Sequence, residues 1–253
     1  MGHARLLGAV ERLAALLGSA RHVCVLTGAG VSAESGVPTF REAQSGLWER
    51  YDPLQLATPE AFEADPKLVW DWYRYRRELV DTAEPNAGHY ALARLAELVP
   101  ELTLVTQNVD GLHARAGSRD VIEFHGNLFV NRCFREGVIV DADPDTDYPS
   151  CPGCGSPLRP GVVWFGEAIP ETALDRAFSA ARDCEVLIAI GTSAAVYPAA
   201  GLIDVARETG SAVAEINPTP AATVDLSIAG PSGEVLPVLV ERLLSIDQKP
   251  PHR

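Results

Sequence analysis

Hydrophobic and polar positions follow two different periods along this chain. Short apolar runs typical of buried strands occupy residues 22–27, 102–106, 186–190 and 212–216. Apolar positions at helical spacing predict helices over residues 4–18, 86–98 and 171–182. Because uniformly apolar strands alternate with helices, we predict an α/β fold with a parallel sheet covered on both faces.

Two stretches interrupt this alternation. Residues 42–85 are rich in Trp, Tyr, Arg and Pro, and their pattern predicts helices without an intervening strand. Residues 127–160 combine clustered Cys with Asp, Pro and Gly and have little periodicity. We interpret both as insertions into the α/β framework that together form a smaller lobe. A cleft between the two parts is where small ligands usually bind.

The composition excludes few fold classes, but the net charge makes some classes of binding partner unfavourable. The chain has 253 residues, 47% of them hydrophobic, and a net charge of −13 that disfavours nucleic acid and anionic membranes as partners. No apolar run approaches the ~20 residues of a membrane span, and the N-terminal stretch does not resemble a signal peptide. Five unevenly clustered cysteines argue against a disulfide framework. We therefore expect a cytoplasmic location.

A glycine-rich turn follows the first predicted strand. Gly28-Ala29-Gly30 permits a tight turn and a close approach of the backbone to a pyrophosphate. So short a motif also fits a turn that binds no ligand. Position 33 is Ala, so the third glycine of the dehydrogenase fingerprint is missing and hydride transfer is disfavoured.

The turn begins a longer string, GAGVSAESGVPTFR over residues 28–41, that resembles the NAD-binding signature of the sirtuins. Further matching blocks follow in order: TQNVDGLH at 106–113, EFHG at 123–126, VWFGE at 163–167, GTS at 191–193 and IN at 216–217. The resemblance implies that NAD is consumed to remove acyl groups from lysine side chains of other proteins or peptides. Nicotinamide, free lysine and O-acyl-ADP-ribose would be the products.

The resemblance implies roles for individual residues. His125 would be the general base that deprotonates a ribose hydroxyl after the acyl oxygen has attacked C1′ and nicotinamide has left. Asn108 would act beside it, with Asp110, in the nicotinamide pocket. The implied NAD-binding residues are Gly28, Ala29, Gly30, Ser32, Glu34, Thr39, Phe40, Arg41, Trp48, Gln107, Asn108, Val109, Asp110, Gly191, Thr192, Ser193, Asn217, Pro218, Thr219 and Ser232.

Simpler roles stay open for several of these residues. His125 fits a structural histidine, and residues 107–110 fit a polar loop at a strand end. Thr192 or Ser193 fits a helix N-cap, and Asn217 before Pro218 fits a turn.

The substrate side of the site is implied by two segments. Residues Val163, Trp164, Phe165, Gly166 and Glu167 resemble the segment that pairs with a substrate peptide as an added strand, although a buried core strand would have a similar pattern.

Tyr73 and Arg76 share one face of a predicted helix over residues 67–80. Together with the small Ala57, they resemble the sirtuin branch that removes succinyl and malonyl groups. An arginine can bind the acyl carboxylate by a charge-assisted hydrogen bond. The alternative is an aromatic and basic helix face that only packs on the main domain.

A metal site is suggested but departs from the usual pattern. Cys151 and Cys154 form a C-x-x-C half-site, whereas the upstream half has Cys133 followed by Glu136 in place of a second Cys. The fourth ligand of a structural zinc would be Glu136, Asp141, Asp143 or water. The alternative is that metal is weakly held or absent.

The predicted fold is thus α/β, with a Rossmann-like parallel sheet over residues 1–41, 86–126 and 161–253 and a small lobe built from residues 42–85 and 127–160, the latter zinc-ribbon-like. A protein mono-ADP-ribosyltransferase and a catalytically idle NAD-sensing module are the rival functions. An intact His125 and the Tyr73 and Arg76 pair favour the deacylase.

Overall fold

The computed structural model describes residues 2–38, 51–142, 146–220 and 223–247. Four of the residues implied in NAD binding, Thr39, Phe40, Arg41 and Trp48, lie outside the described residues.

A six-stranded parallel sheet with strand order β3-β2-β1-β6-β7-β8 forms the centre of the larger part. Its strands are β1 (His22–Thr27), β2 (Glu101–Thr106), β3 (Ile122–Glu123), β6 (Val186–Ile190), β7 (Ala212–Asn217) and β8 (Leu226–Ala229). The predicted parallel sheet and its four strands are confirmed. The two edge strands escaped prediction because β3 is only 2 residues long and β8 alternates between buried and exposed positions.

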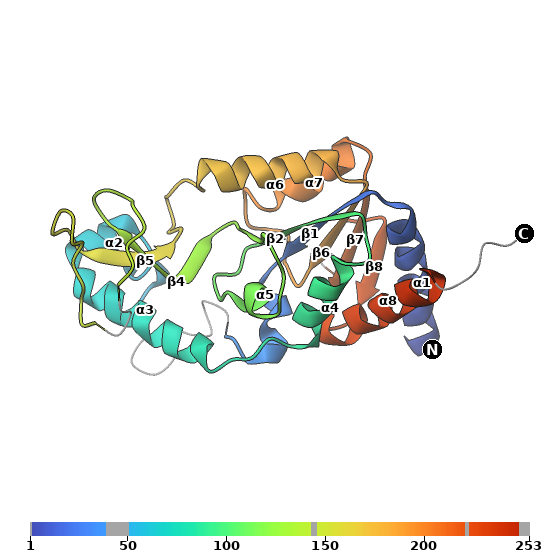
Figure 1. Ribbon diagram of the computed structural model, residues 1–253, viewed down its shortest axis with the longest axis horizontal. Coiled ribbons are helices and arrows are strands. Elements are labelled where there is room, and N and C mark those ends of the chain that lie inside the picture. The colour runs from blue at the N-terminus through green and yellow to red at the C-terminus, as the bar shows by residue number, and fades with distance from the viewer. Residues whose placement is uncertain (1, 39–50, 143–145, 221–222, 248–253) are drawn as a thin grey trace, which may run out of the picture.

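Helices cover both faces of this sheet, as predicted (Figure 1). The helices are α1 (Gly2–Ser19), α4 (Ala87–Leu95), α5 (Leu112–Arg115), α6 (Glu171–Asp183), α7 (Gly201–Glu208) and α8 (Ser232–Asp247). Val23 and Val25 point to the α1, α4 and α8 side, whereas Cys24 and Leu26 point to the α6 and α7 side. This two-sided burial is why β1 is buried at every position except its first and is apolar from Val23 to Leu26. No described helix is long and apolar enough to cross a membrane.

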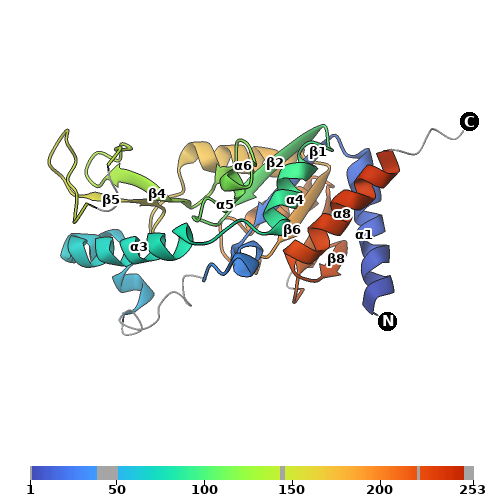
Figure 2. The same ribbon diagram turned by 60° about the horizontal axis from the view of Figure 1, so that its bottom comes forward.

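The smaller part lies at the end of the molecule opposite the termini (Figures 1 and 2). It contains η4 (Pro53–Gln55), α2 (Pro59–Ala64), α3 (Pro66–Asp81) and an antiparallel pair, β4 (Gly126–Cys133) and β5 (Leu158–Val162). Thr58 and Asp65 cap α2 and α3 through their side chains, and a proline occupies the first turn of each helix. Phe62, Trp72 and Trp164 form part of its core.

Candidate active site

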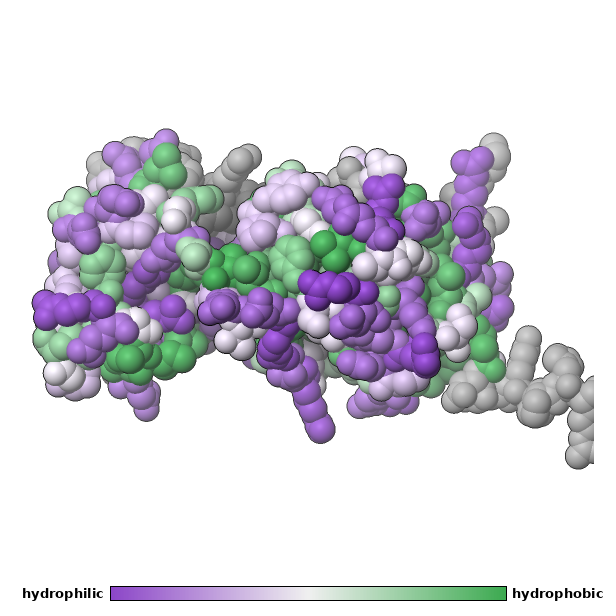
Figure 3. Space-filling model, turned by 90° about the horizontal axis from the view of Figure 1, so that it is seen from above, coloured by the Kyte–Doolittle hydropathy of each residue, from purple (hydrophilic) through white to green (hydrophobic). Residues whose placement is uncertain are grey.

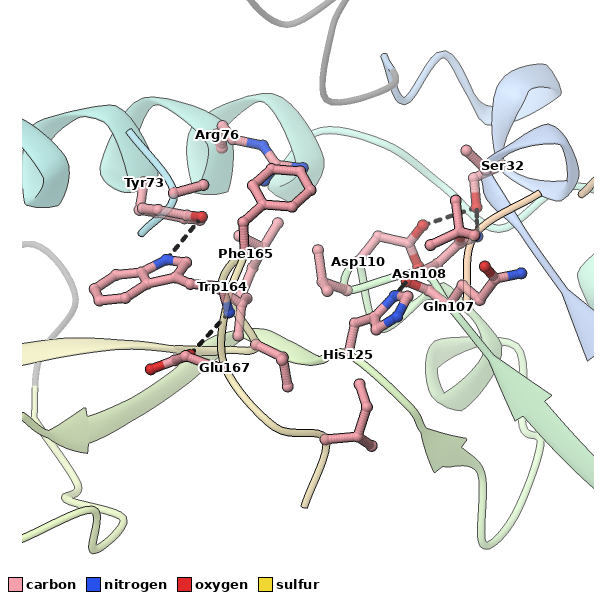
Figure 4. A pocket seen from close by; sticks show the side chains of 18 of the residues that line it. Ser32, Tyr73, Arg76, Gln107, Asn108, Asp110, His125, Trp164, Phe165 and Glu167 are labelled. Carbon is pink, nitrogen blue, oxygen red and sulfur yellow. Dashed lines mark hydrogen bonds between the residues drawn. The ribbon is translucent and has the colours of Figure 1, made fainter. Parts of the chain in front are cut away.

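A cavity of about 690 Å³ lies between the carboxyl edge of the sheet and the smaller part. The sheet side contributes Ser32, Gln107, Asn108, Asp110 and His125, and the smaller part contributes Ala57, Tyr73, Arg76 and residues 162–167 (Figure 4). Seen from above, hydrophobic residues gather at the waist between the two parts of the molecule (Figure 3). The sheet side of the cavity is therefore lined by polar side chains, and the smaller part adds aromatic and apolar side chains together with Arg76.

The glycine turn after β1 packs directly against the loop after β6. A Cβ atom on Gly28 would lie 2.8 Å from the Gly191 carbonyl oxygen, and one on Gly30 would lie 2.7 Å from the Gly191 Cα. Gly191 itself has a φ of +58°, and a Cβ there would lie 2.5 Å from the Val31 nitrogen. These glycines are needed for the contact between the two loops, whatever ligand they approach.

Ser32 is the centre of a buried hydrogen-bond network. Its hydroxyl donates to Asp110 Oδ2 over 2.8 Å and accepts from Asn108 Nδ2 over 3.0 Å. His89 Nδ1 accepts from the Asn86 amide, so its Nε2 carries the proton and donates to Ser32 Oγ over 3.4 Å. The network therefore fixes the side chains of Asn108 and Asp110 at the cavity wall.

His125 follows β3 and is partly buried in the cavity wall. Its Nδ1 lies 3.1 Å from the Gln107 carbonyl oxygen, which can only accept, so Nδ1 carries the proton and Nε2 keeps a basic lone pair. Burial lowers the pKa of His125, and the bond to Gln107 offsets part of that shift. The imidazole is therefore neutral at pH 7 and able to accept a proton.

A second set of polar contacts joins the ends of β2, β6 and β7. Gln107 Nε2 donates to Thr192 Oγ1 over 3.0 Å, and Asn217 Nδ2 donates to the Thr192 carbonyl over 2.9 Å. Neither Thr192 nor Ser193 caps a helix, because α7 begins only at Gly201. Asn217 is the last residue of β7, and Pro218 and Thr219 beyond it are exposed.

Glu34 and Ser232 meet away from the cavity lining. Glu34 Oε2 accepts from the Gly233 amide over 2.7 Å and from Ser232 Oγ over 3.4 Å. This carboxylate thus sits at the first turn of α8, where free amide groups favour a negative charge. These contacts tie the loop that follows β1 to the start of α8.

The side of the cavity that faces away from the sheet is formed by α3 and the loop after β5. Tyr73 and Arg76 are one helical turn apart, and the Arg76 guanidinium carbon lies 5.7 Å from the Tyr73 ring centre. Trp164 Nε1 donates to the Tyr73 hydroxyl over 3.0 Å (Figure 4). Ala57 is buried beside them and lines the same cavity. The aromatic face of α3 therefore packs on its neighbours and also borders the cavity, which reconciles the two interpretations of that helix.

Residues 163–167 form an irregular turn and not a strand. The Val163 amide donates to His125 O, the Phe165 amide to Ala57 O, the Trp164 amide to Glu167 Oε2 and the Glu167 amide to Trp164 O. Because these amides are used internally, a peptide strand would meet mainly carbonyl groups here. A core strand is also excluded, because Phe165 is 54% exposed.

Comparisons with known proteins agree with this geometry. A model of the Sir2 family matches residues 28–198. The chain belongs to the Sir2 family. NAD-dependent protein deacylase 1 of Pseudomonas aeruginosa is 50% identical over 240 residues, which cover 90% of this chain and 96% of that protein. The resemblance to the sirtuins is confirmed at the level of the family.

Other relatives share the whole architecture. The NAD-dependent protein deacylase of Pyrococcus furiosus is 46% identical, covering 96% of this chain and 100% of that protein. A crystal structure of a Sir2 homolog–NAD complex has a TM-score of 0.86 and 45% identity, covering 93% of this chain and 94% of that one. The α/β fold with its smaller second part is thus the fold of Sir2 proteins of known structure.

The Cys cluster of this Sir2 protein includes the residue that departs from the C-x-x-C pattern. One donor atom from each of Cys133, Glu136, Cys151 and Cys154 lies within 4.8 Å of the others. Cys133 Sγ and Cys154 Sγ are 3.5 Å apart, close to the roughly 3.8 Å that tetrahedral zinc–thiolate geometry requires. Three thiols and a carboxylate suit zinc. Asp141 is not a member of this group, and Asp143 lies outside the described residues.

Some residues of the Sir2 site were missed or undervalued in the sequence. His89 contacts Ser32 and caps α4 with Asn86, a role that the N-x-x-H spacing at a helix start could have indicated. His113 is buried, its Nε2 lies 3.0 Å from Thr27 Oγ1, and burial lowers its pKa to about 3. Tyr197 lines the cavity but lies in a loop without a distinctive pattern.

Proposed function

We propose that this Sir2 protein is an NAD-dependent protein-lysine deacylase that prefers succinyl and malonyl groups over acetyl groups. Its relatives carry the name NAD-dependent protein deacylase, and one homologous structure holds NAD. The observation that carries the acyl preference is that Tyr73 and Arg76 line the same cavity as His125.

In the proposed reaction the acyl oxygen of the substrate forms a bond to C1′ of the nicotinamide ribose as the bond to nicotinamide breaks. His125 Nε2 then takes the proton of a ribose hydroxyl, whose oxygen attacks the imidate carbon. Asn108 and Asp110, fixed by Ser32, would orient the leaving nicotinamide carboxamide. Gly28, Gly30 and the loop at residues 191–193 would border the phosphates and ribose of NAD.

The cavity offers two groups that can bind an acyl carboxylate, the Arg76 guanidinium and the Tyr73 hydroxyl. Burial lowers the pKa of Arg76, and nearby Tyr73 and Asp110 offset part of that shift, but a guanidinium keeps its charge at neutral pH. The Tyr73 hydroxyl accepts from Trp164, so its own proton can be donated to a substrate oxygen. A bond to a charged acceptor is stronger than a neutral one, and acetyl-lysine offers no anion for it.

We also propose that zinc is held by Cys133, Cys151, Cys154 and Glu136. The metal would stabilise the lobe formed by β4, β5 and their connection and would take no part in the reaction. None of these residues lines the active-site cavity. This assignment selects Glu136 from the four candidates that the sequence leaves open for the fourth ligand.

An acyl-peptide panel with labelled NAD tests the proposal. Succinyl-, malonyl- and acetyl-lysine peptides of one sequence are compared by initial rates, with the products identified by mass spectrometry. We expect nicotinamide release to require acyl peptide and the label to leave as O-acyl-ADP-ribose, with the acidic acyl groups processed faster. A clear acetyl preference overturns the acyl assignment. Label retained on protein indicates ADP-ribosyl transfer. If no nicotinamide is released with any of the peptides, the protein is an NAD sensor.

A further inference from the structure

Arg159 of β5 is a buried charged residue that lies behind the cavity wall and does not line it. Its guanidinium pairs with both oxygens of Glu167, one of them through an NH2-to-Oε2 bond of 2.9 Å. It also donates to the Val162 carbonyl over 2.7 Å. A bidentate pair of this kind satisfies both ions in a place where either one alone would be costly to bury.

The same guanidinium lies over the ring of Trp164. Its central carbon is 3.4 Å from the centre of the Trp164 ring, so cation and aromatic face are in direct contact. Glu167, the partner of Arg159, also accepts from the Trp164 amide over 2.8 Å. Arg159 therefore contacts Trp164 through its ring and, by way of Glu167, through its backbone.

Trp164 and the residue after it contact the side of the cavity where we propose that the acyl group binds. The indole Nε1 of Trp164 donates to the Tyr73 hydroxyl (Figure 4). The next residue, Phe165, donates its amide to the carbonyl of Ala57. Two walls of the acyl end, Tyr73 and Ala57, are thus bonded to the loop that Arg159 holds from behind.

We propose that Arg159 is a positioning residue that sets the acyl-lysine end of the cavity through Trp164 and Glu167. A lysine cannot replace it, because an ammonium group neither stacks as a plane nor forms a bidentate pair. The part of this inference that concerns acyl selectivity rests on the proposed function, whereas the part that concerns binding of any acyl peptide does not.

The test compares Arg159→Lys with wild type in steady-state kinetics on succinyl and acetyl peptides. We expect KM for both peptides to rise by about tenfold, because lysine keeps the positive charge but loses one hydrogen bond of the bidentate pair with Glu167 and the planar contact with Trp164. KM for NAD should stay within about twofold, because the Ser32 network lies at the other end of the cavity. The ratio of succinyl to acetyl kcat/KM should also fall.

A double-mutant cycle with Tyr73→Phe tests the route of the effect. Tyr73→Phe removes the acceptor of the Trp164 Nε1 bond and lowers the selectivity ratio by itself. In that background, Arg159→Lys should leave the ratio unchanged and still raise peptide KM. Additive losses in the ratio would overturn the route through Trp164.

The matched control is Arg242→Lys, which alters an exposed ion pair between Arg242 and Glu11 of 2.8 Å and should change no kinetic constant. Equal increases in KM for NAD and for peptide, or a lower melting temperature with unchanged kinetics, would overturn the positioning role. If Arg159→Lys does not fold, Glu167→Gln breaks the same bidentate pair from the other side, because an amide offers Arg159 only one acceptor oxygen. The same rise in peptide KM with little change in KM for NAD is then expected. If wild type shows no acidic preference, the proposed acyl specificity fails, and the KM split on acetyl peptide still decides the inference.

Discussion

The two ends of the active-site cavity are built in different ways. At the end where we propose that NAD binds, called the NAD end, Gln107, Asn108 and Asp110 follow β2 and His125 follows β3, a neighbour of β2 in the sheet. At the end where we propose that the acyl group binds, called the acyl end, Tyr73 and Arg76 come from a helix and Trp164 from a loop after an antiparallel strand. The first end depends on the shared edge of a parallel sheet, whereas the second depends on how separate elements pack against one another.

The two ends also differ in charge. The NAD end combines the Asp110 carboxylate with histidines that burial keeps neutral. The acyl end contains the Arg76 guanidinium and, behind the wall, the paired charges of Arg159 and Glu167. From this division we expect that the proposed reaction chemistry and the proposed acyl selectivity can be altered separately within one cavity.

Replacing His125 by Ala gives the largest expected effect. Removal of a general base lowers deacylation by about 10²- to 10⁴-fold. Nicotinamide exchange should persist, because loss of nicotinamide precedes the step that needs the base. Labelled nicotinamide incorporated into NAD in the presence of acyl peptide measures exchange, and release of free lysine peptide measures deacylation. Equal loss of both rates would contradict the assignment of the base to the later step.

Replacing Arg76 by Met tests the other end of the cavity. A hydrogen bond to a charged group contributes about 1.5–3 kcal/mol, so desuccinylation should fall by roughly tenfold to a hundredfold. Deacetylation should change by less than about threefold, because acetyl-lysine has no carboxylate for this residue to bind. Matched succinyl and acetyl peptides measured with both proteins provide the comparison. Equal losses on the two substrates would count against direct contact with the acyl group.

The predictability of the two ends follows from their construction. The apolar runs at 22–27 and 102–106 locate adjacent strand ends, so the sequence alone could bring Gly28 and Asn108 to one edge of the sheet. The helical spacing of Tyr73 and Arg76 likewise predicted a shared face. That this face borders the same cavity as His125 depends on long-range packing that no local pattern encodes.

Other features were beyond the sequence for specific physical reasons. Arg159 gave no signal because its partners, Glu167 and Trp164, are fixed by an irregular turn. Glu34 lies in the string that resembles the NAD-binding signature. Its carboxylate accepts a hydrogen bond from the amide of Gly233, 199 residues further along the chain at the start of α8, and no local pattern predicts this contact. Glu136 lies near the three cysteines, and Asp141 does not belong to this group. This difference depends on how the segment between Cys133 and Cys154 folds, which the residue spacing does not encode.

The Cys cluster should respond to mutation independently of both ends. Glu136→Ala removes the one carboxylate of the group, and zinc affinity should fall by at least the roughly tenfold that loss of an outer-sphere partner costs. Deacylation by zinc-saturated protein should stay within about twofold of wild type. Competition with a chromogenic chelator measures affinity, and Asp141→Ala is the control that removes the same charge outside the cluster. Equal affinities for Glu136→Ala and wild type would exclude Glu136 as a ligand.

The smallest effect expected is a difference between the pH responses of the two ends. His125 must be neutral to accept a proton, and burial lowers its pKa in the free protein. For each peptide, kcat/KM should therefore rise with pH, with a midpoint below the ordinary imidazole value of about 6.5, and level off above it. Arg76 does not titrate near neutrality, and a succinyl carboxylate loses its proton at a pH near that of Glu, about 4.3. The ratio of succinyl to acetyl kcat/KM should therefore stay constant from pH 6 to 9. The measurement is kcat/KM for the succinyl and acetyl peptides as a function of pH. A ratio that changed with pH around the His125 midpoint would mean that the two ends titrate together and are not separable.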